Sequence, residues 1–153
     1  MVSRERGRII NVSSIAGIRG LPYLAAYCAS KHGLIGFTRA LSTEVGDKGV
    51  VVNALCPGYV DTSMTKEACE FIAERSGHSE DEARAFLASE NAGGELLTPE
   101  QVAESIFWLA TQEGEDGGEA RCGPFGRHLA DSCPPRPDFV GGLGRGDGQD
   151  GVR

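Results

Sequence analysis

Two short apolar runs separated by one long helical segment constrain the fold of this chain more than any other feature. The first run, Ile9–Val12, is rich in β-branched residues and ends at two serines, and the second, Val50–Leu55, ends at Pro57-Gly58. Both runs fit buried strands. Between them, from about Ala25 to Val45, apolar or small residues recur at helical spacing until Gly46. This order predicts two parallel strands joined by a right-handed crossover, and therefore an open α/β sheet with helices on its faces.

Further helices are expected on either side of this unit. One broken helical stretch runs from about Thr65 to Ala88, and another helix runs from Glu100 to Ala110. The second is preceded by the sequence TPEQ at 98–101, which supplies an N-cap, a proline at the first helical position and a glutamine three residues after the cap. Residues 1–8 read like the end of a helix that precedes the first strand.

The composition changes sharply near residue 113. Residues 113–153 contain 11 Gly and 4 Pro, few aliphatic side chains and no recognisable period. Such a segment buries little apolar surface to offset its ordering entropy. We expect 113–153 to be an irregular or disordered tail, which leaves 1–112 as the folded part of the 153-residue chain.

Charge and cysteine content exclude several classes of function. The formal net charge is −7, spread along the chain, so nucleic acid is a poor candidate partner. No window resembles a membrane span or the apolar core of a signal peptide, so we expect a cytoplasmic chain. The five cysteines are odd in number and widely spaced, which favours reduced thiols over a zinc knuckle or a disulfide framework. They are Cys28, Cys56, Cys69, Cys122 and Cys133.

Residues whose side chains can take part in catalysis or ligand binding come together at one predicted edge of the sheet. In open α/β sheets, ligands bind outside the carboxyl ends of the strands, which is where Ser14 and Pro57-Gly58 follow their strands. In the first turn of the long helix, Tyr27 and Lys31 are four residues apart and share a face, about 6 Å apart along the axis. An ammonium beside a phenol favours the phenolate, and a serine hydroxyl can hydrogen-bond a substrate oxygen.

A Tyr-x-x-x-Lys pair on an exposed helix face arises by chance in many proteins, but in this chain two further sequence features accompany it. The serine ends a strand 13 residues before the tyrosine, and a Pro-Gly break ends the next strand. The segments GRIINVSSIAG, YCASKHGLIGFTRALSTEV and VVVNALCPGYVDTSM, within residues 7–64, stand in the order and spacing of the short-chain dehydrogenase/reductase family, which this chain resembles. The resemblance implies that 1–112 is the C-terminal part of an NAD(P)-binding domain, a Rossmann-like doubly wound parallel sheet.

The resemblance also implies roles for individual residues. Ser14 would orient and polarise the substrate carbonyl, Tyr27 would be the general acid or base, and Lys31 would favour the phenolate and hold the nicotinamide ribose hydroxyls. A loop would grip the nicotinamide carboxamide of NAD or NADP through Pro57, Gly58, Val60 and Thr62. The implied reaction interconverts a secondary alcohol and a ketone by hydride transfer.

Residues 65–97 should select the small-molecule substrate. Their length is similar to that in the 3-hydroxybutyrate dehydrogenase and acetoacetyl-thioester reductase branches of the family. Relatives that bind a free hydroxy acid place a basic or amide side chain just ahead of the tyrosine, whereas this chain has Leu21–Ala26, so a ketone or 3-oxoacyl thioester is favoured. An apolar set could line a lid over the pocket: Met64, Phe71, Ile72, Phe86 and Leu87.

Several other candidates carry simpler interpretations. Ser13 fits a hydrogen-bonding residue at a strand end better than a catalytic hydroxyl, and His32 points about 100° away from Lys31 on the helix. Cys28 and Cys56 fit small buried side chains. His78 and His128 lie in segments without a metal-ligand pattern, so no metal site is expected.

Small residues form a stripe along the long helix. Its members are Ala26, Ala29, Ser30, Gly33, Phe37 and Ala40. The stripe fits close packing on the sheet, or, as the resemblance implies, contact with the same helix of a second subunit. We therefore expect a homo-oligomer formed through helix 25–45 as one of two alternatives.

Two family features are not found in this sequence. There is no Gly-rich turn after a strand to seat a cofactor pyrophosphate, and residues 113–153 replace the family's last strand. A shortened start and a divergent or frame-shifted end would explain both. The alternative function is accordingly a non-catalytic half-domain that associates with itself or with a complete homologue.

Overall fold

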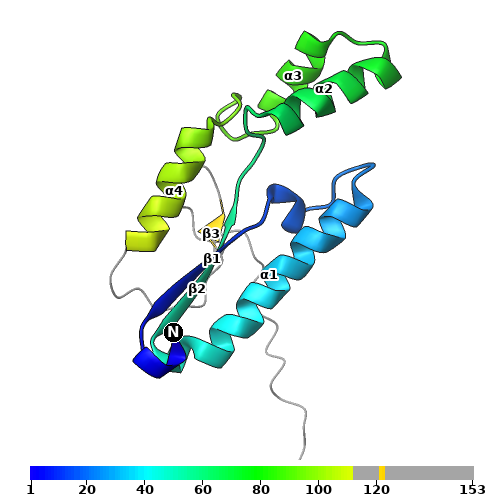
Figure 1. Ribbon diagram of the computed structural model, residues 1–153. Helices are drawn as coiled ribbons and strands as arrows, with labels where there is room; N and C mark the ends of the chain where they lie inside the picture. Colours follow the sequence, from blue (N-terminus) through cyan, green and yellow to red (C-terminus); the bar gives the residue numbers. More distant parts are fainter. Residues whose placement is uncertain (112–120, 123–153) are drawn as a thin grey trace, which may run out of the picture.

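The computed structural model describes residues 1–111 and 121–122 (Figure 1). Strand β1 (Gly7–Val12), helix α1 (Ala25–Val45) and strand β2 (Val50–Cys56) form the predicted strand-helix-strand unit. The two strands are parallel, in register from Gly7 opposite Val50 to Val12 opposite Leu55. Both the parallel pairing and the bounds of the long helix confirm the sequence prediction.

Strand β2 is the centre of the sheet. It is buried along almost its whole length, as its continuous β-branched and aliphatic sequence predicts. On its other side it pairs in parallel with a two-residue strand, β3 (Arg121–Cys122), so the strand order is β1-β2-β3. The sequence predicts an irregular segment here, and for these two residues that prediction is wrong because they extend the sheet beside β2. The prediction for 113–120 and 123–153 lies outside the described residues.

Helices cover both faces of the strands. Asn11 Nδ2 donates a hydrogen bond to Thr38 Oγ1 of α1 at 2.9 Å. Arg8, three positions earlier on β1 and therefore on the other face, donates through Nη1 to the carbonyl of Leu109 in helix α4 (Pro99–Thr111). Figure 1 shows α1 and α4 on opposite sides of the strand pair.

Helix α4 begins with the predicted capping box. The Gln101 backbone N–H donates to Thr98 Oγ1 at 3.2 Å, and Thr98 N–H donates to Gln101 Oε1 at 2.8 Å. The residues before β1 depart from expectation, because they form a single 3-10 turn at Val2–Arg4 and residues 7 and 8 already belong to the strand. None of the helices within residues 1–111 has both the length and the apolarity that crossing a membrane requires.

The broken stretch predicted at 65–88 is a hairpin of two helices, α2 (Ser63–Ser76) and α3 (Glu80–Ser89). Gly77 ends α2 in the left-handed conformation with φ 76°, which glycine adopts without steric cost. The hairpin has its own core of Cys69, Ala83 and Leu87. A separate cluster of Ile35, Ala54 and Cys56 lies between α1 and the sheet. Figure 1 shows the hairpin beyond the carboxyl end of β2, on the side where the site is expected.

Candidate active site

Tyr27 and Lys31 meet beside the carboxyl end of β1. Lys31 Nζ lies 5.6 Å from the centre of the Tyr27 ring and donates a hydrogen bond to the carbonyl of Val12, the last residue of β1, at 3.1 Å. Tyr27 is 38% exposed, so its ring is accessible from outside the chain. The ammonium therefore connects the first turns of α1 to the strand end, two residues before Ser14.

The two serines after β1 have different environments. Ser13 is buried, and its hydroxyl donates to the carbonyl of Lys31 at 3.1 Å, so it joins β1 to α1. Ser14 is partly buried and caps the 3-10 turn at Ile15–Gly17, where its Oγ accepts a hydrogen bond from Ala16 N–H at 3.1 Å. That bond uses an acceptor position of Ser14, and a serine hydroxyl carries an O–H donor as well.

Gly17 allows the loop between β1 and α1 to approach the helix. This loop, residues 13–24, contains Ser13 and Ser14, and we call it the serine loop. A Cβ at this position would lie 2.7 Å from Ser13 Oγ and 2.8 Å from both Ile35 Cδ1 and the Lys31 carbonyl oxygen. A side chain of any size would push the loop away from the helix. The sequence places Gly17 in the loop but contains no local signal of this contact.

The loop proposed for the cofactor, Pro57–Thr62, runs beside the serine loop. The ladder between the strands extends past their ends, because Ser13 N–H donates to Leu55 O at 2.7 Å and Ile15 N–H donates to Pro57 O at 2.9 Å. The structure therefore brings Ser14 and Pro57 to the same edge of the sheet, where the sequence predicted them.

The far end of this loop leads into α2. The Val60 carbonyl accepts hydrogen bonds from Thr65 Oγ1 at 2.5 Å and from Thr62 Oγ1 at 3.4 Å. Thr62 is exposed and is the N-cap residue of α2, without a side-chain capping bond. Its hydroxyl lies at the start of a helix, where free backbone N–H groups and the helix dipole favour hydrogen-bond acceptors and negative charge.

Asn91 is a residue of this region that the sequence did not point to. Its Oδ1 accepts from Tyr59 N–H at 2.9 Å, and its Nδ2 donates to Tyr59 O at 2.8 Å and to Glu95 O at 2.7 Å. Sequence alone suggests only a polar residue at the end of a helix, because its partner is 32 positions earlier.

Two ion pairs connect α3 and Glu90, the residue that follows it, to the same region. Arg84 donates two hydrogen bonds to the Asp61 carboxylate, at 2.9 and 2.7 Å, and this hydrogen bonding lowers the pKa of Asp61 below its usual value and raises that of Arg84. Arg19 pairs with Glu90 at 2.6 Å. The side chains of both ion pairs are largely exposed to solvent, so each pair contributes little to the stability of the fold.

Tyr59 packs against the core of the helical hairpin. Its partial burial raises the pKa of its phenol, and the nearby Arg19 guanidinium acts in the opposite direction. The Tyr59 ring is partly buried against the hairpin. It therefore takes part in positioning the loop that contains it.

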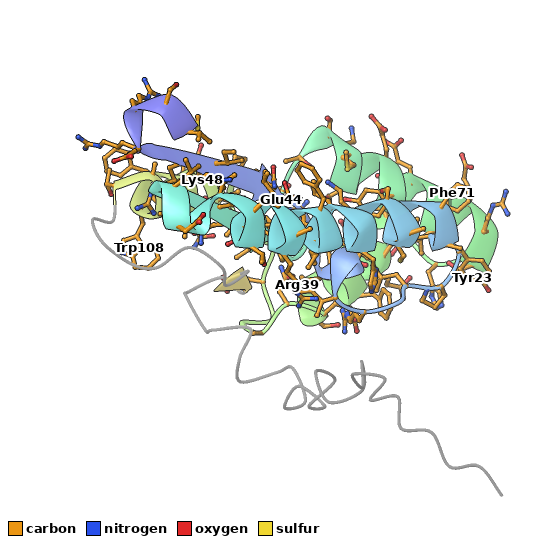
Figure 2. All side chains as sticks on the ribbon, turned by 90° about the horizontal axis from the view of Figure 1, so that it is seen from below. Tyr23, Arg39, Glu44, Lys48, Phe71 and Trp108 are labelled. Atoms are coloured by element: carbon orange, nitrogen blue, oxygen red, sulfur yellow. The ribbon has the colours of Figure 1, made fainter. Side chains whose placement is uncertain are left out.

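The apolar residues predicted to line a lid separate into two groups. Leu87 is buried in the hairpin core and Ile72 packs against it, so these two hold the hairpin together instead of facing a pocket. Met64, Phe71 and Phe86 are 70%, 50% and 58% exposed. Figure 2 shows Phe71 and the fully exposed Tyr23 toward one end of α1, and Trp108 toward the other.

The remaining candidates have local partners. His32 Nδ1 lies 2.9 Å from the carbonyl of Cys28 one turn earlier, and exposed His78 pairs with Glu82 at 3.6 Å. Cys28 and Cys56 are buried thiols, as predicted. His128 lies outside the described residues. Within residues 1–111, no group of three His, Cys, Asp or Glu side chains is arranged to hold a metal ion.

The small-residue stripe of α1 does not pack on the sheet. Residues of the opposite helix face do so, including Ile35, which contacts Ala54 and Cys56 of β2, and Thr38, which is bonded to Asn11 of β1. All six stripe residues are exposed, Phe37 is 56% exposed, and a Cβ added at Gly33 would meet nothing within 4 Å. The interpretation of the stripe as an intrachain contact with the sheet is therefore wrong.

Comparison with known proteins gives a consistent result. Residues 1–72 match the family model of short chain dehydrogenases. The chain is 44% identical over 111 residues to a putative ketoacyl reductase of the monensin polyketide synthase from Streptomyces virginiae. It is 48% identical over 111 residues to a 3-oxoacyl-(acyl-carrier-protein) reductase from Rickettsia prowazekii. Both alignments cover 72% of this chain and 42% of the relative.

A solved structure agrees with these relatives. A variant of actinorhodin polyketide ketoreductase with NADPH matches with a TM-score of 0.67 and 38% identity, over 72% of this chain and 42% of that one. The chain thus spans about two fifths of the length of these relatives.

Proposed function

Because the chain belongs to the short-chain dehydrogenase/reductase family, we propose that its protein interconverts a secondary alcohol and a ketone with NAD or NADP. Its fold is the family's Rossmann-like parallel sheet with helices on both faces. The observation that carries the proposal is the contact of Lys31 with both the Tyr27 ring and the Val12 carbonyl at the carboxyl end of β1.

The residues beside this contact fit the nicotinamide end of such a cofactor. An ammonium has three N–H donors, of which Val12 takes one, so Lys31 can also bind ribose hydroxyls. The Pro57–Thr62 loop offers backbone groups and the exposed Thr62 hydroxyl next to the serine loop. When bound, the cofactor supplies or accepts the hydride. Within residues 1–111, no Gly-rich turn links a strand to a helix in the way that pyrophosphate binding requires.

Three side chains would handle the substrate oxygen. In the direction of reduction, Ser14 donates its O–H to the carbonyl oxygen, and Tyr27 delivers a proton to that oxygen as negative charge develops on it. Lys31 stabilises the phenolate that remains on Tyr27. In the direction of oxidation the phenolate removes the hydroxyl proton.

A 3-oxoacyl thioester is the substrate class that we favour. The two curated relatives described above are a putative ketoacyl reductase and a 3-oxoacyl-(acyl-carrier-protein) reductase. The segment Leu21–Ala26 ahead of Tyr27 contains no charged side chain to pair with a free carboxylate. The exposed apolar residues Met64, Phe71 and Phe86 of the hairpin are compatible with an acyl chain.

A second function rests on a separate observation. The exposed stripe of α1, with Gly33 and Phe37 uncovered, supports association with a second copy or with a complete homologue. We propose that contact as the route to a homo-oligomer. If the isolated chain binds no cofactor, association alone would be its activity.

Cofactor titration and one matched pair of variants test the leading proposal. NADH and NADPH are titrated against the chain with calorimetry and with the fluorescence of Trp108, its single tryptophan. Reduction of an acetoacetyl thioester is then followed for Tyr27→Phe and for its control Tyr23→Phe, whose ring is fully exposed. Tyr27→Phe should bind cofactor normally and lose about 100-fold or more in turnover, while Tyr23→Phe should not change.

Two outcomes contradict the proposal. Unchanged turnover in Tyr27→Phe would remove the tyrosine from the mechanism. No saturable binding of either cofactor would exclude catalysis by this chain and favour the association function, which sedimentation velocity would then detect as a dimer that dissociates in Phe37→Asp.

A further inference from the structure

We propose that Asn91 is a positioning residue that holds the Pro57–Thr62 loop against the end of α3, and that Gly58 is required at its position because Asn91 occupies the adjoining space. The proposal rests on the proposed function only in treating this loop as the nicotinamide loop. The contact itself stands on geometry alone: the Asn91 side chain donates two hydrogen bonds and accepts one, and we call this set the Asn91 bridge.

The bridge uses most of the hydrogen-bonding capacity of the Asn91 side chain. A carboxamide has two N–H donors and one carbonyl oxygen. Both donors go to backbone carbonyls, Tyr59 at 2.8 Å and Glu95 at 2.7 Å, and the oxygen accepts from Tyr59 N–H at 2.9 Å. Asn91 therefore pairs with Tyr59 as a neighbouring strand would, and it links that residue to Glu95. Aspartate would place a carboxylate against two carbonyl oxygens, so the amide is required.

Gly58 is complementary to the bridge in shape. A Cβ at position 58 would come closer to Asn91 Oδ1 than van der Waals contact allows. Gly58 is not among the glycines with positive φ, so alanine would be acceptable to its backbone. The need for glycine therefore comes from the space that Asn91 takes, and removing the Asn91 side chain should remove that need.

The bridge is the centre of a larger connection between loop and hairpin. Leu97 N–H donates to Tyr59 O at 2.9 Å, and Asp61 N–H donates to Leu97 O at 2.7 Å, which forms a short parallel pairing after the bridge. Glu90, the residue before Asn91, pairs with Arg19 of the serine loop. Three segments that border the candidate site thus meet at residues 90–91, and displacement of the end of α3 would displace the loop.

Single-amide hydrogen exchange on the 153-residue chain tests the bridge directly. In Asn91→Ala, exchange at the Tyr59 amide should rise about tenfold or more, because its acceptor is gone, and the amides of Asp61 and Leu97 should follow. Exchange at the Ser13 amide, which is bonded to Leu55 across the sheet, should not change and reports that the rest of the fold is intact. Glu95→Ala is the matched control, since it removes an exposed side chain from the same segment.

Gly58→Ala disrupts the same contact from the loop, because its Cβ would displace the Asn91 side chain. It provides a second test if Asn91→Ala does not fold. It should raise Tyr59 exchange in the wild-type background and add little in the Asn91→Ala background. Gly93→Ala is its control, because a Cβ there meets nothing within 4 Å. Unchanged Tyr59 exchange in Asn91→Ala, or fully additive effects of the two substitutions, would overturn the proposal.

Cofactor affinity separates this inference from the proposed function. If the chain binds NADPH, Asn91→Ala and Gly58→Ala should weaken binding several-fold relative to Glu95→Ala. Lost Tyr59 protection with unchanged NADPH affinity would refute the positioning role. Lost protection in a chain whose wild type binds neither NADH nor NADPH would support the bridge and exclude cofactor-dependent catalysis by this chain.

Discussion

Replacing Gly17 by alanine should destabilise the fold through a contact at the candidate site. The new Cβ would lie 2.7 Å from Ser13 Oγ, 2.8 Å from Ile35 Cδ1 and 2.8 Å from the Lys31 carbonyl oxygen. The Ile35 methyl and the serine hydroxyl can rotate, but the carbonyl belongs to the backbone of α1 and cannot. The 3-10 turn and the helix must therefore move apart by several tenths of an ångström.

The cost of that movement can be bounded. Inserting a methyl group into a tight contact costs about 1–3 kcal/mol, and loss of the hydrogen bond from Ser13 to the Lys31 carbonyl costs about 1 kcal/mol. Because Gly17 does not have a positive φ, alanine recovers about 0.4–1 kcal/mol by restricting the unfolded chain. The free energy of unfolding should therefore fall by about 1–3 kcal/mol.

Urea unfolding followed by circular dichroism measures this change. Gly36→Ala is the matched control, because Gly36 is exposed within α1 and a Cβ there meets nothing within 4 Å. That variant should gain about 0.5–1 kcal/mol from helix propensity. If Gly17→Ala were as stable as wild type, the close approach of the serine loop to α1 would not exist in solution, and the geometry derived for Ser14 would be wrong.

Three further predictions concern the helical hairpin. Ser79→Ala removes the capping box of α3, in which Ser79 and Glu82 exchange hydrogen bonds, and should cost about 1 kcal/mol in urea unfolding; no change would mean that α3 begins elsewhere. Leu87→Ala should lower the free energy of unfolding by about 2–5 kcal/mol and speed amide hydrogen exchange throughout α2 and α3. Faster exchange only in the helical turn around residue 87 would contradict a shared core. Because Arg84 lowers the pKa of Asp61 below its ordinary value of 3.8, the stabilising contribution of this pair is present above about pH 4 and lost as the pH falls through the lowered pKa. Unfolding midpoints between pH 6 and 2.5 should show this loss in wild type, and an Asp61→Asn variant with the same pH dependence would contradict it.

Local sequence signals predicted much of this fold. The long helix has the predicted bounds, Ala25–Val45. The helical spacing of apolar and small residues indicates its extent, and Gly46 marks its end in the sequence. The capping box of α4 was visible because its residues are three apart. The parallel strands followed from their apolar runs and from the helix between them. These features depend on short-range patterns, which a single sequence displays directly.

The missed features depend on contacts between distant segments. Asn91 and Gly58 each have ordinary local roles, at a helix end and after a Pro, and only the structure shows that they adjoin. The apolar character of Leu87, in a segment over the site, predicts a pocket lining, but a helical hairpin needs a core of its own and Leu87 is part of that core. Periodicity indicates which side chains are apolar, without indicating whether they face another helix or a ligand.

The separation of the two apolar clusters has a consequence for the site. The cluster around Ile35 joins α1 to the sheet, and the cluster around Leu87 joins α2 to α3. The links described between these units are largely polar and lie near the surface: the Asn91 bridge and the ion pairs Arg84–Asp61 and Arg19–Glu90. Apolar burial stabilises each unit internally, whereas polar links near the surface each contribute little and open locally. Substitutions at these links should therefore alter the position of the hairpin over the candidate site, and with it ligand affinity, at a small cost in the stability of the sheet.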